Sequence, residues 1–165
     1  MEITAKRRSI LALLQVNARM SIQEIADRLS LETEDVASMI NAMEGDGTIL
    51  GYCAMVNAEA VDDGEVRAII EVEVQPERDR GFDHVALAIG RFSEVTSVYL
   101  VSGRYDLRLE VTGKSLQEIA FFVAGKLASV EGVKATATHF LLKKYKEAGF
   151  MLDKDQEYER LKVSP

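Results

Sequence analysis

Apolar residues in the first 51 positions recur with the spacing of α-helices. Three stripes have this spacing: Ile10, Leu13 and Leu14; Ile22, Ile25, Ala26 and Leu29; and Val36, Met39, Ile40 and Met43. Ser21 and Glu24 form the pattern of a capping box, which predicts that the second helix starts near Ser21. Gly45 and Gly47 predict the end of the third helix. Three short helices joined by tight turns indicate a helix-turn-helix domain.

The pattern changes after the third helix. The run TILGYCAMV, residues 48–56, is rich in strand-forming residues and predicts a strand that leaves the helices. The polar and acidic run NAEAVDDGE that follows is typical of a linker. We therefore expect a helix-turn-helix domain with its exit strand over residues 1–57, and a linker over residues 58–65.

From Val66 onward, apolar residues alternate with polar ones, which is the period of a β-strand. Helical spacing returns over residues 82–92, and two strands are predicted at residues 95–101 and 106–113, joined as a hairpin by the short link SGRY. Ser115 and Glu118 form a second capping box, and the run KATATHFLLKKY, residues 134–145, is the last predicted strand. This order predicts an α+β fold with a ferredoxin-like βαββαβ domain over residues 66–148.

Both helices of a ferredoxin-like sheet pack on one face and leave the other face uncovered. We expect the uncovered face to expose Phe140 or Leu142, and the simplest way to bury such an apolar patch is self-association. Dimerisation also suits a helix-turn-helix protein, because two copies about one DNA turn apart bind a pseudo-palindromic site. Residues 149–165 are mostly charged and are expected to form a solvated tail.

Composition narrows the possible function classes. Hydrophobic residues make up 47% of the 165 positions, and no apolar run is long enough to span a bilayer, so we expect no membrane partner and a cytoplasmic location. Cys53 is the only cysteine, and only two histidines accompany it, so we expect no disulfide, no metal site and no cofactor. The net charge of −7 argues against a broad nucleic-acid coat but is compatible with a small basic patch.

The segments ILALLQVNARMSIQEIADRLSL, GTILGYCAMVN and SVYLVSGRYDLRLEV, in this order, resemble the leucine-responsive and asparagine regulators of the Lrp/AsnC family. The resemblance extends to about Met151. It implies a winged helix-turn-helix that binds DNA, followed by an amino-acid-sensing domain of the RAM type. It also implies a homodimer that often assembles further, into octamers or discs.

The predicted DNA-reading segment LETEDVASMINAMEGDGTI, residues 31–49, contains no lysine or arginine, although the family usually has them in this helix. Residues 1–51 carry five cations against eight anions, whereas DNA affinity comes largely from neutralised phosphates. We expect Thr33, Ser38 and Asn41 to contact bases. The phosphate contacts are assigned to the cations Lys6, Arg7, Arg8, Arg19 and Arg28. The alternative is that these are ordinary solvated surface residues.

A free amino acid presents a carboxylate and an ammonium group, so its site needs both donors and acceptors. The turn SGRYD supplies both, because Gly103 lets the backbone approach closely and Asp106 offers a carboxylate. We assign the effector to Ser102, Gly103, Tyr105 and Asp106; by resemblance, the family's glycine, aromatic and aspartate fall on the last three. The resemblance adds Thr136 and Thr138, on one side of the last strand. The alternative is turn chemistry and strand propensity alone.

Two other functions fit parts of the sequence. An amino-acid-sensing or partner-binding oligomer with a degenerate DNA reader would explain the acidic third helix. A sirohaem-decarboxylase-like enzyme would share the fold, but such enzymes carry additional histidines and arginines, and here His84 and His139 are far apart. His139 is expected to be partly buried, opposite Thr138, with a backbone partner. The sequence therefore predicts a transcription regulator that is not an enzyme, with DNA and a small-molecule effector as partners.

Overall fold

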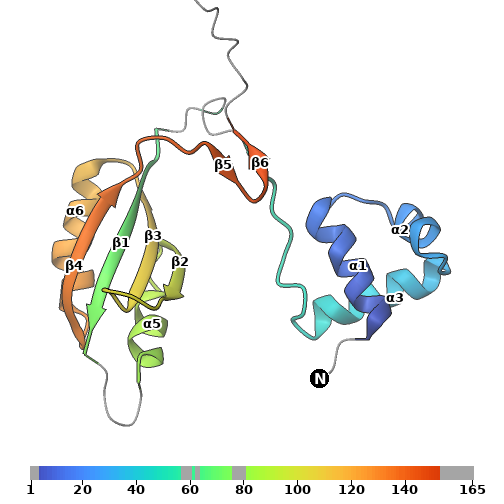
Figure 1. Ribbon diagram of the computed structural model, residues 1–165, viewed down its shortest axis with the longest axis horizontal. Coiled ribbons are helices and arrows are strands. Elements are labelled where there is room, and N and C mark those ends of the chain that lie inside the picture. Colours follow the sequence, from blue (N-terminus) through green and yellow to red (C-terminus); the bar gives the residue numbers. More distant parts are fainter. Residues whose placement is uncertain (1–3, 57–60, 62–63, 76–80, 153–165) are drawn as a thin grey trace, which may run out of the picture. The chain divides into compact units, whose positions relative to one another are not determined.

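The computed structural model describes residues 4–56, 61, 64–75 and 81–152 of the chain. The chain divides into two compact units, Met1–Val56 and Asn57–Pro165 (Figure 1). No helix among the described residues is both long enough and apolar enough to cross a membrane.

The N-terminal unit is a bundle of three short helices, α1 (Ala5–Val16), α2 (Ile22–Leu29) and α3 (Thr33–Gly45). Their apolar stripes meet in one core, as predicted, and its fully buried residues are Ile10, Ile25, Val36 and Met43. Ser21 caps α2, because its Oγ accepts the N–H of Glu24 at 3.1 Å. The Glu24 carboxylate binds Arg28, one turn along the helix, at 2.7 Å instead of reaching back to close a full capping box.

The exit strand expected at residues 48–56 is not formed, and residues 50–56 have no regular secondary structure. Within the described part of the chain, sheet pairing joins only strands of the C-terminal unit. A lone strand leaves its backbone N–H and C=O groups without partners, which explains why strand propensity is not enough here. The expected wing is therefore also not formed, and the segment stays open, with Leu50 95% exposed.

Tyr52 fastens this open segment to the end of α3. Its hydroxyl donates to the Glu44 carboxylate at 2.7 Å, and this hydrogen bond raises the pKa of Tyr52 above its ordinary value. The side chain is nevertheless 51% exposed. The segment thus begins at a defined place on the bundle and presents apolar side chains to solvent.

The C-terminal unit has the predicted order of elements. They are β1 (Val66–Val74), α5 (Asp83–Ile89), β2 (Val95–Leu100), β3 (Leu107–Gly113), α6 (Leu116–Gly125), the 3₁₀ turn η1 (Leu127–Ser129) and β4 (Val133–Phe140). The four strands form one antiparallel sheet in the order β2-β3-β1-β4, and α5 and α6 pack on one of its faces (Figure 1). The prediction of a ferredoxin-like α+β domain is confirmed.

The central strand β1 alternates strictly between the two faces of the sheet. Its core side is formed by Ala68, Ile70, Val72 and Val74, all buried against the helices together with Leu107, Leu109 and Val111 of β3. From the helices, Val85, Ile89, Ile119 and Phe122 complete this core. At the start of α6, the Ser115 Oγ accepts the N–H of Glu118 at 3.1 Å, and the Glu118 carboxylate accepts the N–H of Lys114 at 2.7 Å.

The uncovered face of the sheet carries ion pairs beside apolar residues such as Ile69 and Tyr99, and the expectation that Phe140 is exposed there is wrong. Phe140 lies directly opposite Ala68 in the β1–β4 pairing, and directly opposed residues of antiparallel strands share a face. Phe140 therefore lies on the helix-covered side. Leu142 follows the end of β4 and is 97% exposed.

Ion pairs run across this uncovered face. His139 of β4 lies 3.3 Å from the Glu71 carboxylate of β1, and its side chain is 60% exposed, so it is neither buried nor bound to backbone as we expected. On β3, Arg108 and Glu110 lie 3.8 Å apart. The alternation of β1 and β3 thus produces a mixed surface of cations and anions.

The chain after β4 forms a small hairpin, β5 (Lys146–Glu147) and β6 (Phe150–Met151). Ala148 and Gly149 both have positive φ, 44° and 89°, as a two-residue type I′ turn requires. Residues 149–152 therefore differ from the solvated tail expected from position 149 onward. Residues 153–165 of the expected tail lie outside the described residues.

We expect Gly132→Ala to destabilise the C-terminal unit. Gly132 has φ +90°, and an added Cβ would lie 2.9 Å from Cγ2 of Val85 in α5. Strain and overlap together should lower the free energy of unfolding by about 1–3 kcal/mol. Urea unfolding followed by circular dichroism measures the change. Gly125→Ala is the matched control, because it lies in α6 with no atom within 4 Å of an added Cβ; equal midpoints for both variants would contradict the strain assigned to Gly132.

Candidate DNA and effector sites

Helix α3 presents part of the predicted base-reading set to solvent. Ser38 and Asn41, three residues apart, lie on one exposed face of the helix, opposite the buried Val36 and Met43. Thr33 is half-buried at the start of the helix, where its hydroxyl lies 3.4 Å from the Glu34 carboxylate. The structure therefore brings Ser38 and Asn41 together and sets Thr33 apart from them.

Acidic residues lie at the N-terminal end of the same helix. Glu32 occupies the N-cap without making a side-chain capping bond, and Glu34 and Asp35 are in the first turn. Carboxylates at this end favour the helix dipole, by about 0.3–1 kcal/mol each when exposed. They stabilise α3, but they also make this end of it repulsive to phosphate.

Two of the five predicted phosphate-binding cations are already paired within the chain. Arg7 of α1 binds Asp46, just after α3, at 3.1 Å, and Arg28 binds Glu24 at 2.7 Å. Asp46 also accepts hydrogen bonds from the hydroxyl and N–H of Thr48, and these, with Arg7, hold the pKa of Asp46 below its ordinary value. Arg7 therefore serves to tie α1 to the end of α3.

The other three predicted cations are Lys6, Arg8 and Arg19. All three are exposed, and none makes an ion pair with another described residue. They are the side chains of this unit best able to contact phosphate without breaking an existing pair.

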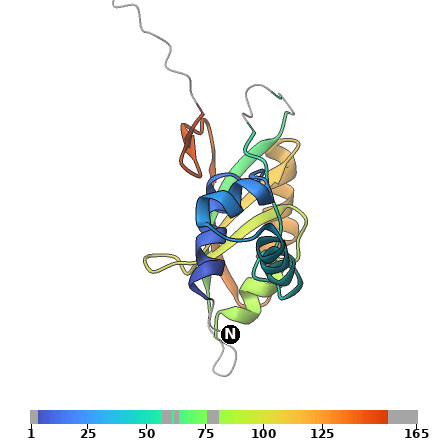
Figure 2. The ribbon, with the colours of Figure 1, turned by 90° about the vertical axis from the view of Figure 1, so that its right-hand side faces the viewer.

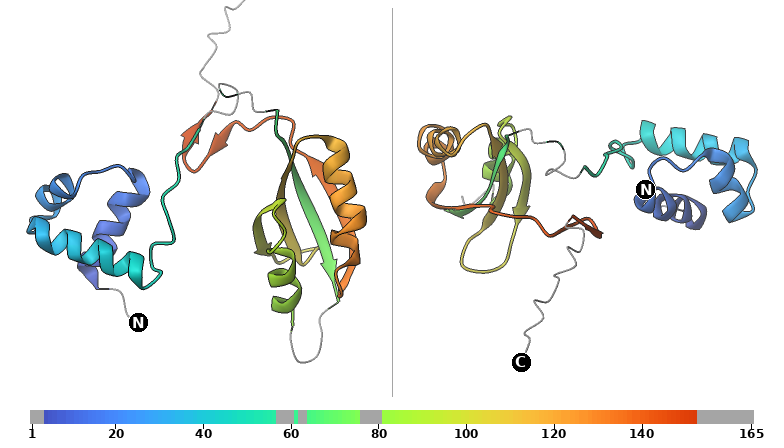
Figure 3. Two further views of the ribbon diagram at one scale, coloured as in Figure 1. Left: turned by 180° about the vertical axis from the view of Figure 1, so that it is seen from behind. Right: turned by 90° about the horizontal axis from the view of Figure 1, so that it is seen from above.

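The predicted effector residues of the SGRYD turn lie in the connection between β2 and β3, which projects from the sheet on the side away from α6 (Figures 2 and 3). Ser102 and Gly103 are exposed, and Gly103 has φ +151° with open space around an added Cβ. Tyr105 is half-buried, and the Arg104 guanidinium lies 5.6 Å from the centre of its ring.

Asp106 has a structural role that the sequence did not reveal. Its Oδ2 accepts the backbone N–H of Val74 at 2.8 Å, and its own N–H donates to the carbonyl of Val72 at 3.1 Å. These bonds fasten the turn to β1 where the β1–β4 register shifts between Glu73 and Val74. One carboxylate oxygen of Asp106 is thus committed to the fold, and the other takes no part in these bonds.

The two predicted threonines lie on one side of β4, as alternation requires. Thr136 is opposite Val72 and Thr138 is opposite Ile70, so both share the helix-covered face, where they are half-buried. Because Val72 also accepts the N–H of Asp106, Thr136 and Asp106 flank the same residue of β1 from its two sides. They are about two strand spacings apart, roughly 10 Å.

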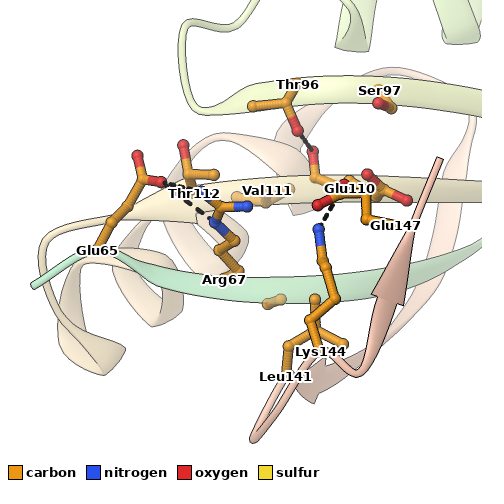
Figure 4. A pocket seen from close by; sticks show the side chains of 11 residues that line it. Glu65, Arg67, Thr96, Ser97, Glu110, Val111, Thr112, Leu141, Lys144 and Glu147 are labelled. Atoms are coloured by element: carbon orange, nitrogen blue, oxygen red, sulfur yellow. Dashed lines mark hydrogen bonds and ion pairs between the residues drawn. The ribbon is translucent and has the colours of Figure 1, made fainter. Parts of the chain in front are cut away.

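A cavity that the sequence reading missed lies at the other end of the sheet, on the uncovered face (Figure 4). It has a volume of about 300 Å³ and lies between the start of β1, the end of β3 and the chain leading into the β5–β6 hairpin. Arg67, Glu110 and Thr112 line it from the sheet, and Lys144 and Glu147 line it from the hairpin region. The sign of this cavity in the sequence was the alternation of charged residues along the predicted strands.

Both halves of the chain match known domain families. Residues 5–44 match the AsnC-type helix-turn-helix domain, and residues 67–150 match the Lrp/AsnC ligand binding domain. An HTH-type transcriptional regulator of Bacillus subtilis (strain 168), YugG, is 41% identical over 166 residues that cover both chains completely. The proline dehydrogenase transcriptional activator of Rhodobacter capsulatus is 31% identical over 83% of this chain and 88% of its own.

Solved structures agree with this assignment. The transcriptional regulator NMB0573 of Neisseria meningitidis, solved as a complex with L-Met, is 25% identical and superposes with a TM-score of 0.67 over 88% of this chain and 94% of its own. AsnC of E. coli, 21% identical, superposes with a TM-score of 0.65 over 89% of this chain and 97% of its own, and this likeness shows the fold alone.

These matches bear on the enzyme alternative that the sequence left open. They cover the helix-turn-helix and the ferredoxin-like domain separately, and the related proteins are named as transcriptional regulators, so the decarboxylase alternative has no support. The chain belongs to the Lrp/AsnC family and is a helix-turn-helix transcriptional regulator with a ligand-binding domain.

Proposed function

We propose that this regulator acts as a homodimer, assembling further to an octamer, which binds a pseudo-palindromic DNA site under the control of an amino acid. We divide the chain into a DNA-binding domain over residues 1–57, a linker over residues 58–65 and a sensing domain that starts at residue 66. The partners we propose, DNA and an amino acid, place its action in the cytoplasm. The observation that carries the proposal is the pairing of a helix-turn-helix with an Lrp/AsnC ligand-binding domain in one chain.

In the DNA complex, the exposed face of α3 contacts base edges and three cations contact phosphates. Asn41 is the best candidate for sequence reading, because its amide can form two hydrogen bonds with adenine, and Ser38 lies beside it. Lys6, Arg8 and Arg19 are the phosphate contacts that require no ion pair to be broken. Arg7 and Arg28 would first have to leave Asp46 and Glu24, so we expect them to contribute less to phosphate binding. Thr33 contributes only at the edge of the DNA interface.

In the effector complex, the amino acid lies against the β2–β3 turn. The oxygen of Asp106 that does not hold Val74 receives the ammonium group, and Ser102 with the backbone at Gly103 receives the carboxylate. Tyr105 covers the ligand. Thr136 and Thr138 lie on the helix-covered face of the sheet, and Thr136 is roughly 10 Å from Asp106 across Val72. The L-Met complex of the N. meningitidis regulator supports an amino acid as the class of ligand.

Two surfaces support self-association. The open segment at residues 50–56 exposes Leu50, Tyr52, Met55 and Val56 to solvent and has the strand propensity to pair with a copy of itself. The uncovered sheet face mixes cations and anions, so a second copy can oppose each charge with its opposite. Two-fold pairing would also place two α3 helices for two half-sites.

A second candidate function is a ligand-sensing oligomer that has lost its DNA reader. The acidic start of α3 and the pairing of Arg7 and Arg28 within the chain favour it. It differs from the first in a single measurable property, namely salt-sensitive and sequence-dependent DNA binding.

We expect salt dependence to identify the cations that contact DNA. With three phosphate contacts per protomer, a dimer should show a slope of log affinity against log salt of about −5, compared with about −9 for five contacts. Arg8→Ala should weaken binding to all sequences and reduce the steepness of this slope by about 2 per dimer. Asn41→Ala should weaken specific binding by about 1–3 kcal/mol and leave non-specific binding intact.

Fluorescence anisotropy with the protein's own upstream DNA measures these effects. Lys114→Ala, which removes a cation from the C-terminal unit, is the control and should change neither affinity nor slope. Absence of sequence-dependent binding by the wild type at micromolar concentration would favour the sensor without a reader.

We expect Asp106→Asn to separate the structural and ligand-binding roles of this side chain. Asparagine keeps an oxygen that can accept the Val74 N–H but loses the charge that pairs with the ammonium group. Affinity for L-methionine, L-leucine or L-asparagine, whichever binds, should fall at least about tenfold in calorimetry. The urea midpoint should stay closer to wild type than that of Asp106→Ala, and unchanged ligand affinity would remove Asp106 from the site.

We expect the wild type to sediment as a dimer or larger species and Leu50→Glu to shift it toward the monomer. A carboxylate placed in a buried apolar interface is left without a partner, which should weaken the dimer at least about tenfold. Sedimentation velocity over a concentration series measures this. Val16→Glu, at another position that is largely exposed, is the control, and a wild type that stays a single subunit would refute the dimer.

A further inference from the structure

We propose that Glu34 of α3 reads a cytosine base in each half of the DNA site. This inference rests on the proposed DNA-binding function and names one base that the reader selects. Glu34, Ser38 and Asn41 are all exposed, and they recur along α3 at spacings of four and three residues. Side chains with this spacing form one stripe along a helix. The stripe lies opposite the buried Val36 and Met43.

The polar groups of this stripe are not used by the fold. The side chains of Ser38 and Asn41 make no hydrogen bond with another residue in the described part of the chain. Glu34 contacts only its neighbour, because the Thr33 hydroxyl donates to Oε2 at 3.4 Å, which is long for a hydrogen bond. Among the described residues, none bonds to Oε1 of Glu34. The stripe therefore offers a carboxylate, a hydroxyl and an amide to the DNA.

The chemistry of the carboxylate selects the base. An ionised carboxylate accepts hydrogen bonds and cannot donate them. In the major groove, guanine presents two acceptors, thymine presents an acceptor and a methyl group, and adenine presents an acceptor beside its donor. Cytosine presents only the N4 amino group, which is a donor. Cytosine is thus the base that Glu34 can bind without facing an acceptor on the same base.

The negative charge of Glu34 makes the contact selective. Repulsion from the phosphates acts on every DNA sequence, so it lowers specific and non-specific affinity alike. The hydrogen bond to cytosine forms only at the correct sequence. A carboxylate in the stripe therefore raises the ratio of specific to non-specific affinity, which decides where a regulator binds. This suits a reader in which Arg7 and Arg28 are already paired within the chain.

The length of α3 sets the spacing between two of the bases. Glu34 and Asn41 are seven residues apart, which is about 10 Å along the axis of a helix. Successive bases are about 3.4 Å apart along the duplex. A helix that follows the groove therefore places the two contacts about three base pairs apart. With Asn41 bound to adenine, each half-site contains a cytosine and an adenine at this separation.

Asp35 provides a matched control for Glu34. It is also exposed and also lies in the first turn of α3, but successive residues of a helix are turned by about 100° around its axis. Asp35 therefore lies at the edge of the stripe. Glu34→Gln and Asp35→Asn remove the same charge from the same end of the helix dipole. They differ in the proposed contact with a base.

Selection of duplexes from a random-sequence library by the full-length protein tests the inference, with anisotropy titrations of each base at the selected positions. We expect the wild type to select a cytosine about three base pairs from an adenine, and to bind about tenfold more weakly when this cytosine is replaced. Glu34→Gln should prefer adenine at the same position, because glutamine can form two hydrogen bonds with adenine. Asp35→Asn should keep the preference for cytosine. Both variants should bind non-specific DNA more tightly than the wild type, because each loses a charge that repels phosphate.

A change in the DNA tests the same contact on the wild type. N4-methylcytosine at the selected position keeps the base pair but loses the N–H that points into the major groove. The wild type should therefore bind this duplex about tenfold more weakly. The same modification at a cytosine outside the two half-sites is the control and should leave the affinity unchanged. Urea midpoints confirm that each protein variant is folded.

Three outcomes would overturn the inference alone. They are sequence-dependent binding without a preference for cytosine, the same preference in Glu34→Gln and the wild type, and an equal change of preference in Asp35→Asn. Each would leave a DNA reader without the carboxylate contact. Absence of sequence-dependent binding by the wild type is a distinct result, since it refutes the proposed DNA-binding function and the cytosine contact together.

Discussion

The alternation of the central strand β1 is the constraint on which the C-terminal domain depends. Ala68, Ile70, Val72 and Val74 are buried against α5 and α6, so the residues between them must face the uncovered side. A shift of one residue would put Arg67 and Glu71 into the core. Burying these two charged side chains would destabilise the fold far more than any single cross-strand pair stabilises it. The register of β1 therefore determines which residues enter the core, which residues lie on the uncovered face and which residues stand at each end of the strand.

The two ends of β1 have different chemistry because different loops are fastened to them. At the Val74 end, Asp106 holds the β2–β3 turn through backbone hydrogen bonds. At the Arg67 end, the N–H of Leu141 holds the chain that leads to β5 and β6. Each end therefore joins a polar loop to a rigid strand, which is a favourable arrangement for a binding site. The turn at the first end was marked in the sequence by the motif SGRYD, whereas the cavity at the second end becomes visible only when the strands are paired.

Helix positions and strand order could be predicted because they depend on local periodicity. The side of Phe140 could not, because the run KATATH has small residues on both faces and only pairing with Ala68 decides its side. The exit strand was wrongly predicted because propensity does not supply a pairing partner. The two-residue turn at Ala148 and Gly149 was hidden in a charged sequence. The candidate effector residues were predicted from a turn motif, and they stay a prediction. The residues of the cavity were missed because they come from three separate segments.

The number of cations that this regulator can offer to DNA depends on how its N-terminal cations are used within the fold. Arg7 joins α1 to the end of α3 through Asp46, and Arg28 stabilises α2 through Glu24, so part of the positive charge of the reader serves its fold. Few remaining cations mean weak non-specific binding, because that term scales with the phosphates neutralised. Specificity depends on the ratio of specific to non-specific affinity. A reader with few cations therefore depends on its base contacts. In the dimer that we propose, it would also depend on two copies acting together, so the geometry of that dimer, and any ligand that alters it, would control DNA binding.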